Sequence, residues 1–141
     1  MSTEALEALL ARSRQGVLTT IKSDGRPQLS NVVYTYDPDA RLVRMSVTAG
    51  RAKTANLRRD PRASLHVTTP DFRTYAVAEG MAELTAAAAD PRDATVAELI
   101  EVYRALAGEH PDWEDYRRAM VADRRLVVRL PVARLYGGGG S

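Results

Sequence analysis

The sequence predicts a mainly β protein with helices, an α+β fold built around a closed β-barrel. Three observations predict it. Between residues 17 and 84, short apolar runs with strand-like alternation are separated by Gly, Pro and Asp turn signals. From residue 91 to 108 the apolar period changes to 3.6, which is typical of a helix. Residues 126–130 return to a strand pattern, so helices are inserted between strands of one sheet system.

The first half of the chain is predicted to be a helix followed by antiparallel strands. Ser2 or Thr3 can cap a helix with leucines at helical spacing, and this helix ends before Gly16. We expect it to cover one end of the barrel. Turn signals at 23–27 and 37–40 then separate the strands of a meander. The predicted strands are 17–21, 28–36 and 42–48.

The second half alternates between strands and helices. A strand at 63–68 is followed by a long strand at 74–84, in which Gly80 is typical of a bulge or bend. Asp90 is a candidate cap and Pro91 a candidate first residue for a helix that ends at Gly108. A short helix begins at 111–116 and a closing strand covers 126–130.

Length and composition indicate a single globular domain. The 141 residues are 45% hydrophobic and 27% charged, and no apolar run approaches the ~18 residues of a membrane span. The start of the chain lacks a basic stretch followed by an apolar one, so we expect a cytoplasmic protein with no membrane partner. The net charge of +2 does not favour nucleic acid as a partner.

The last five residues, Gly-Gly-Gly-Gly-Ser at 137–141, have the sequence of a flexible linker. We interpret them as an engineered linker or tag remnant, which makes 1–136 the predicted domain.

The most informative segment is the basic stretch that follows the strand at 42–48. Gly50 ends this strand, and Arg51 and Lys53 then occupy the first turn of a short helix. Free backbone N–H groups and the positive end of the helix dipole already attract anions at that point. Cations there oppose the dipole, so a bound anion is expected to offset them. The alternative is a solvated basic face made of Arg51, Lys53, Arg58, Arg59 and Arg62.

Familiar catalytic constellations are absent from the sequence. The chain has no cysteine, which excludes disulfides and thiolate chemistry, and its only histidines are His66 and His110. No paired carboxylates have a convincing spacing for acid–base work, and we predict no metal site. His66 lies in an alternating strand and is interpreted as a packed or half-exposed side chain.

Three separated motifs carry a family resemblance. They are Gly-Arg-Pro-Gln-Leu-Ser-Asn-Val at 25–32, Arg-x-Lys-Thr-x-Asn-Leu-x-x-Asp-Pro-Arg-Ala-Ser at 51–64 and Tyr-Ala-Val-Ala-Glu-Gly at 75–80. Over about residues 5–136, the chain resembles the split β-barrel (FMN-binding-like) flavin and deazaflavin enzymes related to pyridoxamine 5′-phosphate oxidase. The similarity is greatest to the actinobacterial branch that uses coenzyme F420. This resemblance implies a homodimer with the cofactor in the groove between subunits.

The resemblance also implies a set of cofactor-binding residues. Residues 29–32 would lie beside the ring, 46–48 would contact the ring or its ribityl chain, and Arg51 and Lys53 would hold the phosphate. Tyr75 would approach the cofactor from the partner subunit, or it is an interface aromatic without a cofactor contact. Ser30 and Asn31 are alternatively explained as satisfying the strand edge. The implied residues are Gln28, Leu29, Ser30, Asn31, Val32, Ser46, Val47, Thr48, Arg51, Ala52, Lys53, Asn56 and Tyr75.

The function implied is that of an F420H2-dependent reductase, which transfers a hydride to an unsaturated or conjugated small molecule. No protein residue is predicted to be catalytic, because the cofactor carries the chemistry. The carboxy-terminal substrate motif of a pyridoxamine phosphate oxidase is not evident after Val128, and no Gly-x-Gly-x-x-Gly turn is present for a nicotinamide dinucleotide. The alternatives are a non-catalytic carrier of F420 or flavin, and an FMN-dependent enzyme related to pyridoxamine 5′-phosphate oxidase.

Overall fold

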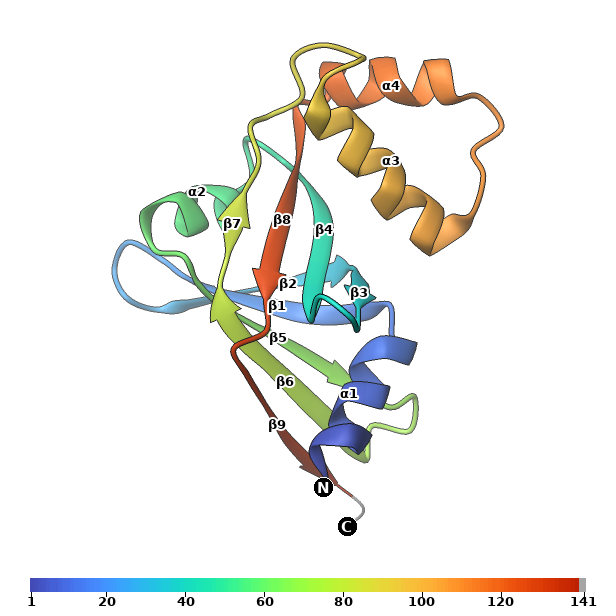
Figure 1. The fold of residues 1–141 in the computed structure, drawn as a ribbon. Helices are drawn as coiled ribbons and strands as arrows, with labels where there is room; N and C mark the ends of the chain where they lie inside the picture. The colour runs from blue at the N-terminus through green and yellow to red at the C-terminus, as the bar shows by residue number, and fades with distance from the viewer. Residues whose placement is uncertain (140–141) are drawn as a thin grey trace.

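The computed structural model describes residues 1–139 and contains two antiparallel sheets with four helices (Figure 1). The strand order is β2-β1-β5-β6-β9 in the five-stranded sheet and β3-β4-β8-β7 in the four-stranded sheet. The predicted α+β class is therefore confirmed. The strands are β1 Gln15–Ile21, β2 Pro27–Val33, β3 Thr35–Asp37, β4 Leu42–Thr48, β5 Arg62–Thr68, β6 Thr74–Met81, β7 Glu83–Leu84, β8 Arg125–Pro131 and β9 Arg134–Gly139. The helices are α1 Thr3–Arg12, α2 Ala52–Arg59, α3 Ala94–Ala107 and α4 Trp113–Ala122.

The two sheets enclose one apolar core that α1 covers at one end. Leu65 of the five-stranded sheet and Met45 of the four-stranded sheet are fully buried in it, together with Leu10 of α1. The helix begins as predicted, because the Ser2 hydroxyl accepts a hydrogen bond from Ala5 N at 3.1 Å. None of the helices within residues 1–139 has the length and apolar character that a bilayer span requires.

Two segments predicted as single long strands are each divided between the sheets. The segment 28–36 is broken at Tyr34, whose buried hydroxyl donates a hydrogen bond to the Leu10 carbonyl at 2.7 Å. The segment 74–84 is broken at Ala82, where the chain leaves β6 for β7. Just before that break, a side chain at Gly80 would lie 2.1 Å from the Pro131 carbonyl oxygen, so β8 passes too closely for any other residue.

Helices α3 and α4 lie together at the opposite end of the molecule from α1 (Figure 1). The start of α3 differs from the prediction, because Asp93 caps it and accepts a hydrogen bond from Val96 N at 2.9 Å. Asp90 instead accepts a hydrogen bond from Arg92 N in the preceding turn. Asp112 caps α4 in the same way as Asp93 caps α3. The two helices share a second, smaller core with Val127 of β8.

Residues 137–139 continue a strand. Gly137–Gly139 complete β9 and pair with Thr74–Ala76 of β6. A side chain at Gly137 would lie 2.1 Å from the Tyr75 carbonyl oxygen and 2.7 Å from a Leu6 methyl group. The predicted domain boundary at 136 therefore falls inside a strand, and the flexible-linker interpretation does not describe 137–139. Residues 140 and 141 lie outside the described part of the chain.

Candidate functional site

The turn between β4 and α2 is fixed by Thr48. The Arg51 Nε donates to the Thr48 hydroxyl at 3.1 Å, and the Thr54 hydroxyl donates to the Thr48 carbonyl at 2.8 Å. Arg51 is the N-cap residue, but its side chain forms no capping hydrogen bond to the helix. The first backbone N–H groups of α2 thus point out of the helix end without intrahelical acceptors. The predicted short helix with cations in its first turn is confirmed.

A third cation lies at this end of β4. Arg125 begins β8 and pairs with Thr48, and its Nη1 donates to the Ser46 carbonyl at 3.5 Å. Within residues 1–139, the ion pairs at or below 4.0 Å include none formed by Arg51, Lys53 or Arg125. We call these three residues the cation cluster.

The surroundings of Lys53 in the cation cluster disfavour its protonated form. Burial lowers the pKa of Lys53 below its ordinary value, and the nearby charges of Arg51 and Arg125 lower it further. A bound anion would counter that repulsion and would accept hydrogen bonds from the free N–H groups of α2. The arrangement fits a phosphate group.

An open groove of about 470 Å³ adjoins the cation cluster. It lies between the β1–β2 hairpin and the start of α2, and it reaches Ala52, the first residue of the helix. Four of the predicted cofactor-binding residues are therefore brought together here. The groove is lined by Lys22, Ser23, Pro27, Gln28, Leu29, Ala52 and Asn56.

Asn56 holds α2 against the five-stranded sheet. Its buried amide nitrogen donates to the Thr20 hydroxyl at 3.1 Å and to Gln28 Oε1 at 2.6 Å. Its oxygen accepts a hydrogen bond from Arg59 at 2.9 Å. The amide of Asn56 is thus occupied within the protein, while the Gln28 amide nitrogen keeps its donors for the groove. The position of Asn56 supports the groove wall, and a direct cofactor contact stays a prediction.

Strand alternation divides the other predicted residues between two faces. Leu29 and Asn31 are exposed on the outer face of β2, whereas Ser30 is half-buried on its inner face. Val32 and Val47 are buried in the core, so only their backbone is available to a ligand. A cofactor lying beside β2 and β4 would therefore contact some of these residues through main-chain atoms alone.

Tyr75 lies away from the groove. It pairs with Thr68, and its ring stacks on His66 with 5.7 Å between the centroids. The strand register places Tyr75 at the end of the five-stranded sheet opposite the end that α2 contacts through Ile21. Within one chain, Tyr75 and the cation cluster are not brought together.

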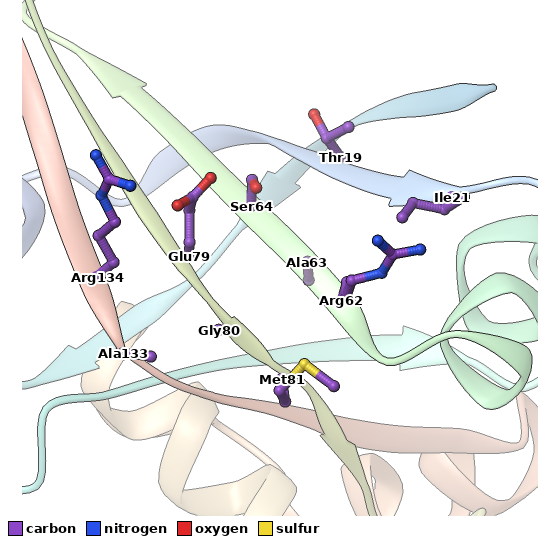
Figure 2. A pocket seen from close by; sticks show the side chains of 10 residues that line it. All are labelled: Thr19, Ile21, Arg62, Ala63, Ser64, Glu79, Gly80, Met81, Ala133 and Arg134. Carbon is purple, nitrogen blue, oxygen red and sulfur yellow. The ribbon is translucent and has the colours of Figure 1, made fainter. Parts of the chain in front are cut away.

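A second hollow lies on the outer face of the five-stranded sheet. It measures about 530 Å³ and is mainly apolar, with Glu79 and Arg134 side by side on β6 and β9 (Figure 2). None of the predicted cofactor-binding residues lines it.

Sequence reasoning missed two residues of the site, Lys22 and Arg125. Lys22 lies in the hairpin turn that borders the groove, and Arg125 starts a strand far along the chain from α2. Neither belongs to a recognisable local motif, so only the three-dimensional pairing of β4 with β8 reveals Arg125. Within residues 1–139, no three His, Asp or Glu side chains are grouped so as to hold a metal ion.

Comparison with known proteins decides the family. Residues 2–137 match the family described as pyridoxamine 5′-phosphate oxidase. This chain belongs to that family. The predicted split-barrel fold is confirmed by solved structures with the same architecture.

Two further comparisons involve Mycobacterium tuberculosis. An F420H(2)-dependent biliverdin reductase from this organism is 28% identical over 137 residues, covering 97% of this chain and 88% of the relative. The solved structure of a conserved hypothetical protein from the same species has a TM-score of 0.74 and 26% identity, covering 99% of this chain and 85% of that one.

A solved F420 reductase structure is also similar to this member of the pyridoxamine 5′-phosphate oxidase family. Its TM-score is 0.70 at 25% identity, covering 92% of this chain and 94% of that one.

Proposed function

We propose that this protein is an F420H2-dependent reductase that acts on an unsaturated or conjugated small molecule. The observation that carries the proposal is the cation cluster of Arg51, Lys53 and Arg125, which has no carboxylate partner within residues 1–139 and borders the groove at Ala52. The F420H2-dependent reductase and the F420 reductase among the relatives support the choice of coenzyme.

The residues present fit the phosphate arm of such a coenzyme. Lys53 and Arg51 would hold the phosphate together with the Ala52 N–H, and Gln28 and Leu29 would border the adjoining ring portion. When bound, F420H2 supplies a hydride for the reduction of an electron-poor carbon. The chain's own task is to bind and orient the coenzyme, which explains why the groove has no paired acid and base of its own.

We also propose that two copies pack through the outer face of the five-stranded sheet. This face exposes Leu29, Val33 and Met81 at 63%, 51% and 56%, and it carries Tyr75 as well. Exposed apolar side chains at this density are typical of interaction surfaces. Because Tyr75 lies far from the cation cluster of its own chain, its predicted cofactor contact requires a partner subunit.

Anaerobic turnover of F420H2 tests the enzymatic proposal. We expect loss of F420H2 in the presence of at least one electrophile from a panel of quinones, enones and tetrapyrroles, with no parallel oxygen uptake. Reduced nicotinamides should not replace F420H2. The absorption spectrum after addition of F420 or FMN identifies the bound coenzyme.

Two outcomes would replace this proposal. If every electrophile left F420H2 unchanged while the protein bound it tightly, the protein would be a coenzyme carrier. If FMN remained bound and substrate-dependent oxygen uptake followed, the protein would be an FMN-dependent oxidase.

Light scattering tests the dimer. We expect a mass twice the 15.4 kDa of one chain, and replacement of Met81 by Glu should shift the population toward monomer. A monomer that binds F420 as tightly as the unaltered protein would contradict the shared groove.

A further inference from the structure

The Arg125 side chain has an unsatisfied donor as well as an unneutralised charge. Its Nε is buried and forms no hydrogen bond within residues 1–139. A buried donor without an acceptor is destabilising, because it has lost its hydrogen bonds to water. Its Nη1 has only the long contact of 3.5 Å with the Ser46 carbonyl. These two features show that the guanidinium of Arg125 is only weakly satisfied by the described chain.

The orphaned Nε alone does not decide the matter. Arg44 on the same sheet also has a buried Nε without a partner. The Arg44 guanidinium, however, forms ion pairs with Glu98 and Glu101, so its charge is compensated by the protein. Arg125 has no such carboxylate within residues 1–139.

The titratable groups near Arg125 come from α2 and α4. Lys53 lies near it at the start of α2, with Arg51 close to Lys53, and both are cations. Tyr116 of α4 is the other neighbour: burial raises its pKa to about 12, and the charge of Arg125 partly opposes that rise. Since Tyr116 is neutral at physiological pH, the protein supplies no negative charge from these positions.

We propose that Arg125 is the third ligand of the anion site, and that its guanidinium donates to the same phosphate group as Lys53 and the start of α2. This inference rests on the proposed function, because it assumes a phosphate-bearing coenzyme in the groove. Arg125 is a binding and positioning residue: it fixes where the phosphate lies, and takes no part in the transfer of hydride. No local motif of the sequence contains it.

The experiment uses the fact that the chain has only two lysines, Lys22 and Lys53. Isotope-labelled lysine therefore gives two side-chain signals in the unaltered protein and a third in an Arg125→Lys variant, and the Lys53 signal is assigned by its absence from Lys53→Ala. The variants are Arg125→Gln, Arg125→Lys and Arg124→Gln. Arg124 is the matched control because it is adjacent and exposed, and its backbone carbonyl accepts the hydrogen bond from Ala49 N, which a side-chain substitution leaves in place.

We expect Arg125→Gln to weaken F420 binding roughly 10- to 100-fold, the range for one charge-assisted hydrogen bond. The titration midpoint of Lys53 should rise in this variant, because one neighbouring positive charge is lost. Arg125→Lys should keep the midpoint low but still lose affinity, because lysine lacks the planar fork. Arg124→Gln should change neither quantity.

Unaltered F420 affinity in Arg125→Gln would overturn the inference, whether or not the Lys53 midpoint moved. Inorganic phosphate separates this failure from failure of the proposed function. If the unaltered protein binds neither F420 nor FMN, yet phosphate shifts the Lys53 signal in it and not in Arg125→Gln, the coenzyme is wrong and the role of Arg125 stands. If phosphate shifts Lys53 equally in both proteins, Arg125 is not a ligand of the site.

Discussion

The middle and the end of the β4–β8 pair carry similar charges in different surroundings. In the middle, Arg44 lies opposite Arg129, and both guanidiniums reach Glu98 of α3. At the end, Thr48 lies opposite Arg125, and the cations there have no carboxylate within residues 1–139. Two arginines from one strand pair can therefore serve different purposes.

The difference follows from what packs over each part of the sheet. Helix α3 supplies Glu98, whose side chain is only 13% exposed, so the Arg129 pair holds the helix on the sheet. Helix α2 instead presents its own N-terminus and two more cations to the end of β4. Cations that are paired with a carboxylate stabilise the fold. Cations without a carboxylate repel one another, and a bound anion reduces that repulsion.

The largest expected effect is on the uncompensated side. Lys53→Ala should weaken F420 binding by about 1.5 to 3 kcal/mol, because a charge-assisted hydrogen bond to the phosphate is lost. The free energy of unfolding without ligand should not fall, since a repulsive charge is removed. A fluorescence titration and a urea unfolding curve measure the two quantities. If F420 affinity were unchanged and the fold intact, these basic residues would be interpreted as a solvated surface without a bound anion.

Glu98→Gln should produce the opposite pattern. The variant leaves Arg44 and Arg129 without their shared carboxylate, so we expect a loss of about 1–2 kcal/mol in the free energy of unfolding. F420 affinity should remain within about twofold, which corresponds to ~0.4 kcal/mol. If the variant unfolded as the unaltered protein does, α3 would be held by its apolar contacts alone.

The two regions should respond to pH in separate windows, and in both windows the free energy of unfolding rises with pH. The ion pair with Arg129 lowers the pKa of Glu98, so its stabilisation is complete above the ordinary value of 4.5 and is lost as pH falls through the folded value. The folded pKa of Lys53 is also lowered, so the free energy of unfolding rises as pH increases from that value to the ordinary 10.5.

Anion affinity should fall across the alkaline window, because Lys53 loses its proton there. Unfolding curves over the pH range with Lys53→Ala and Glu98→Gln as controls check both windows, since each variant should lose only one. Loss of the acidic window in Lys53→Ala would contradict the assignment.

The smallest expected effect is that of Arg58→Gln. Arg58 is exposed in the last turn of α2, away from the helix start, so both stability and F420 affinity should change by less than about 0.5 kcal/mol. This variant removes the same charge as Arg125→Gln from the same region. A large loss of F420 affinity would show that Arg58 also binds the coenzyme, and that the anion site continues along the exposed face of α2.

The sequence predicted the elements that have a recognisable residue pattern within their own segment. β4 is observed at Leu42–Thr48 as predicted, because its alternation is bounded by a turn on one side and Gly50 on the other. The start of α2 and its two cations were likewise predictable, since the strand end, the glycine and the basic residues are consecutive in the chain. The family resemblance from the same motifs is confirmed by the match over residues 2–137.

Other features had no local signal. β9 ends in Gly137–Gly139, which offer no side-chain pattern, and their strand conformation comes from pairing with β6. The division of 28–36 at Tyr34 depends on a hydrogen bond to α1, and alternation along the strand does not encode it.

The fold class, the family and the two cations at a helix start could be predicted from the chain alone, because each depends on residues that are neighbours in the sequence. Three further results follow from the three-dimensional structure: Arg125 lies near Lys53, Asn56 donates hydrogen bonds to Thr20 and Gln28, and Tyr75 lies away from the groove. Strand register sets these three results. Register depends on pairing between distant segments, and residue type and spacing constrain that pairing only weakly.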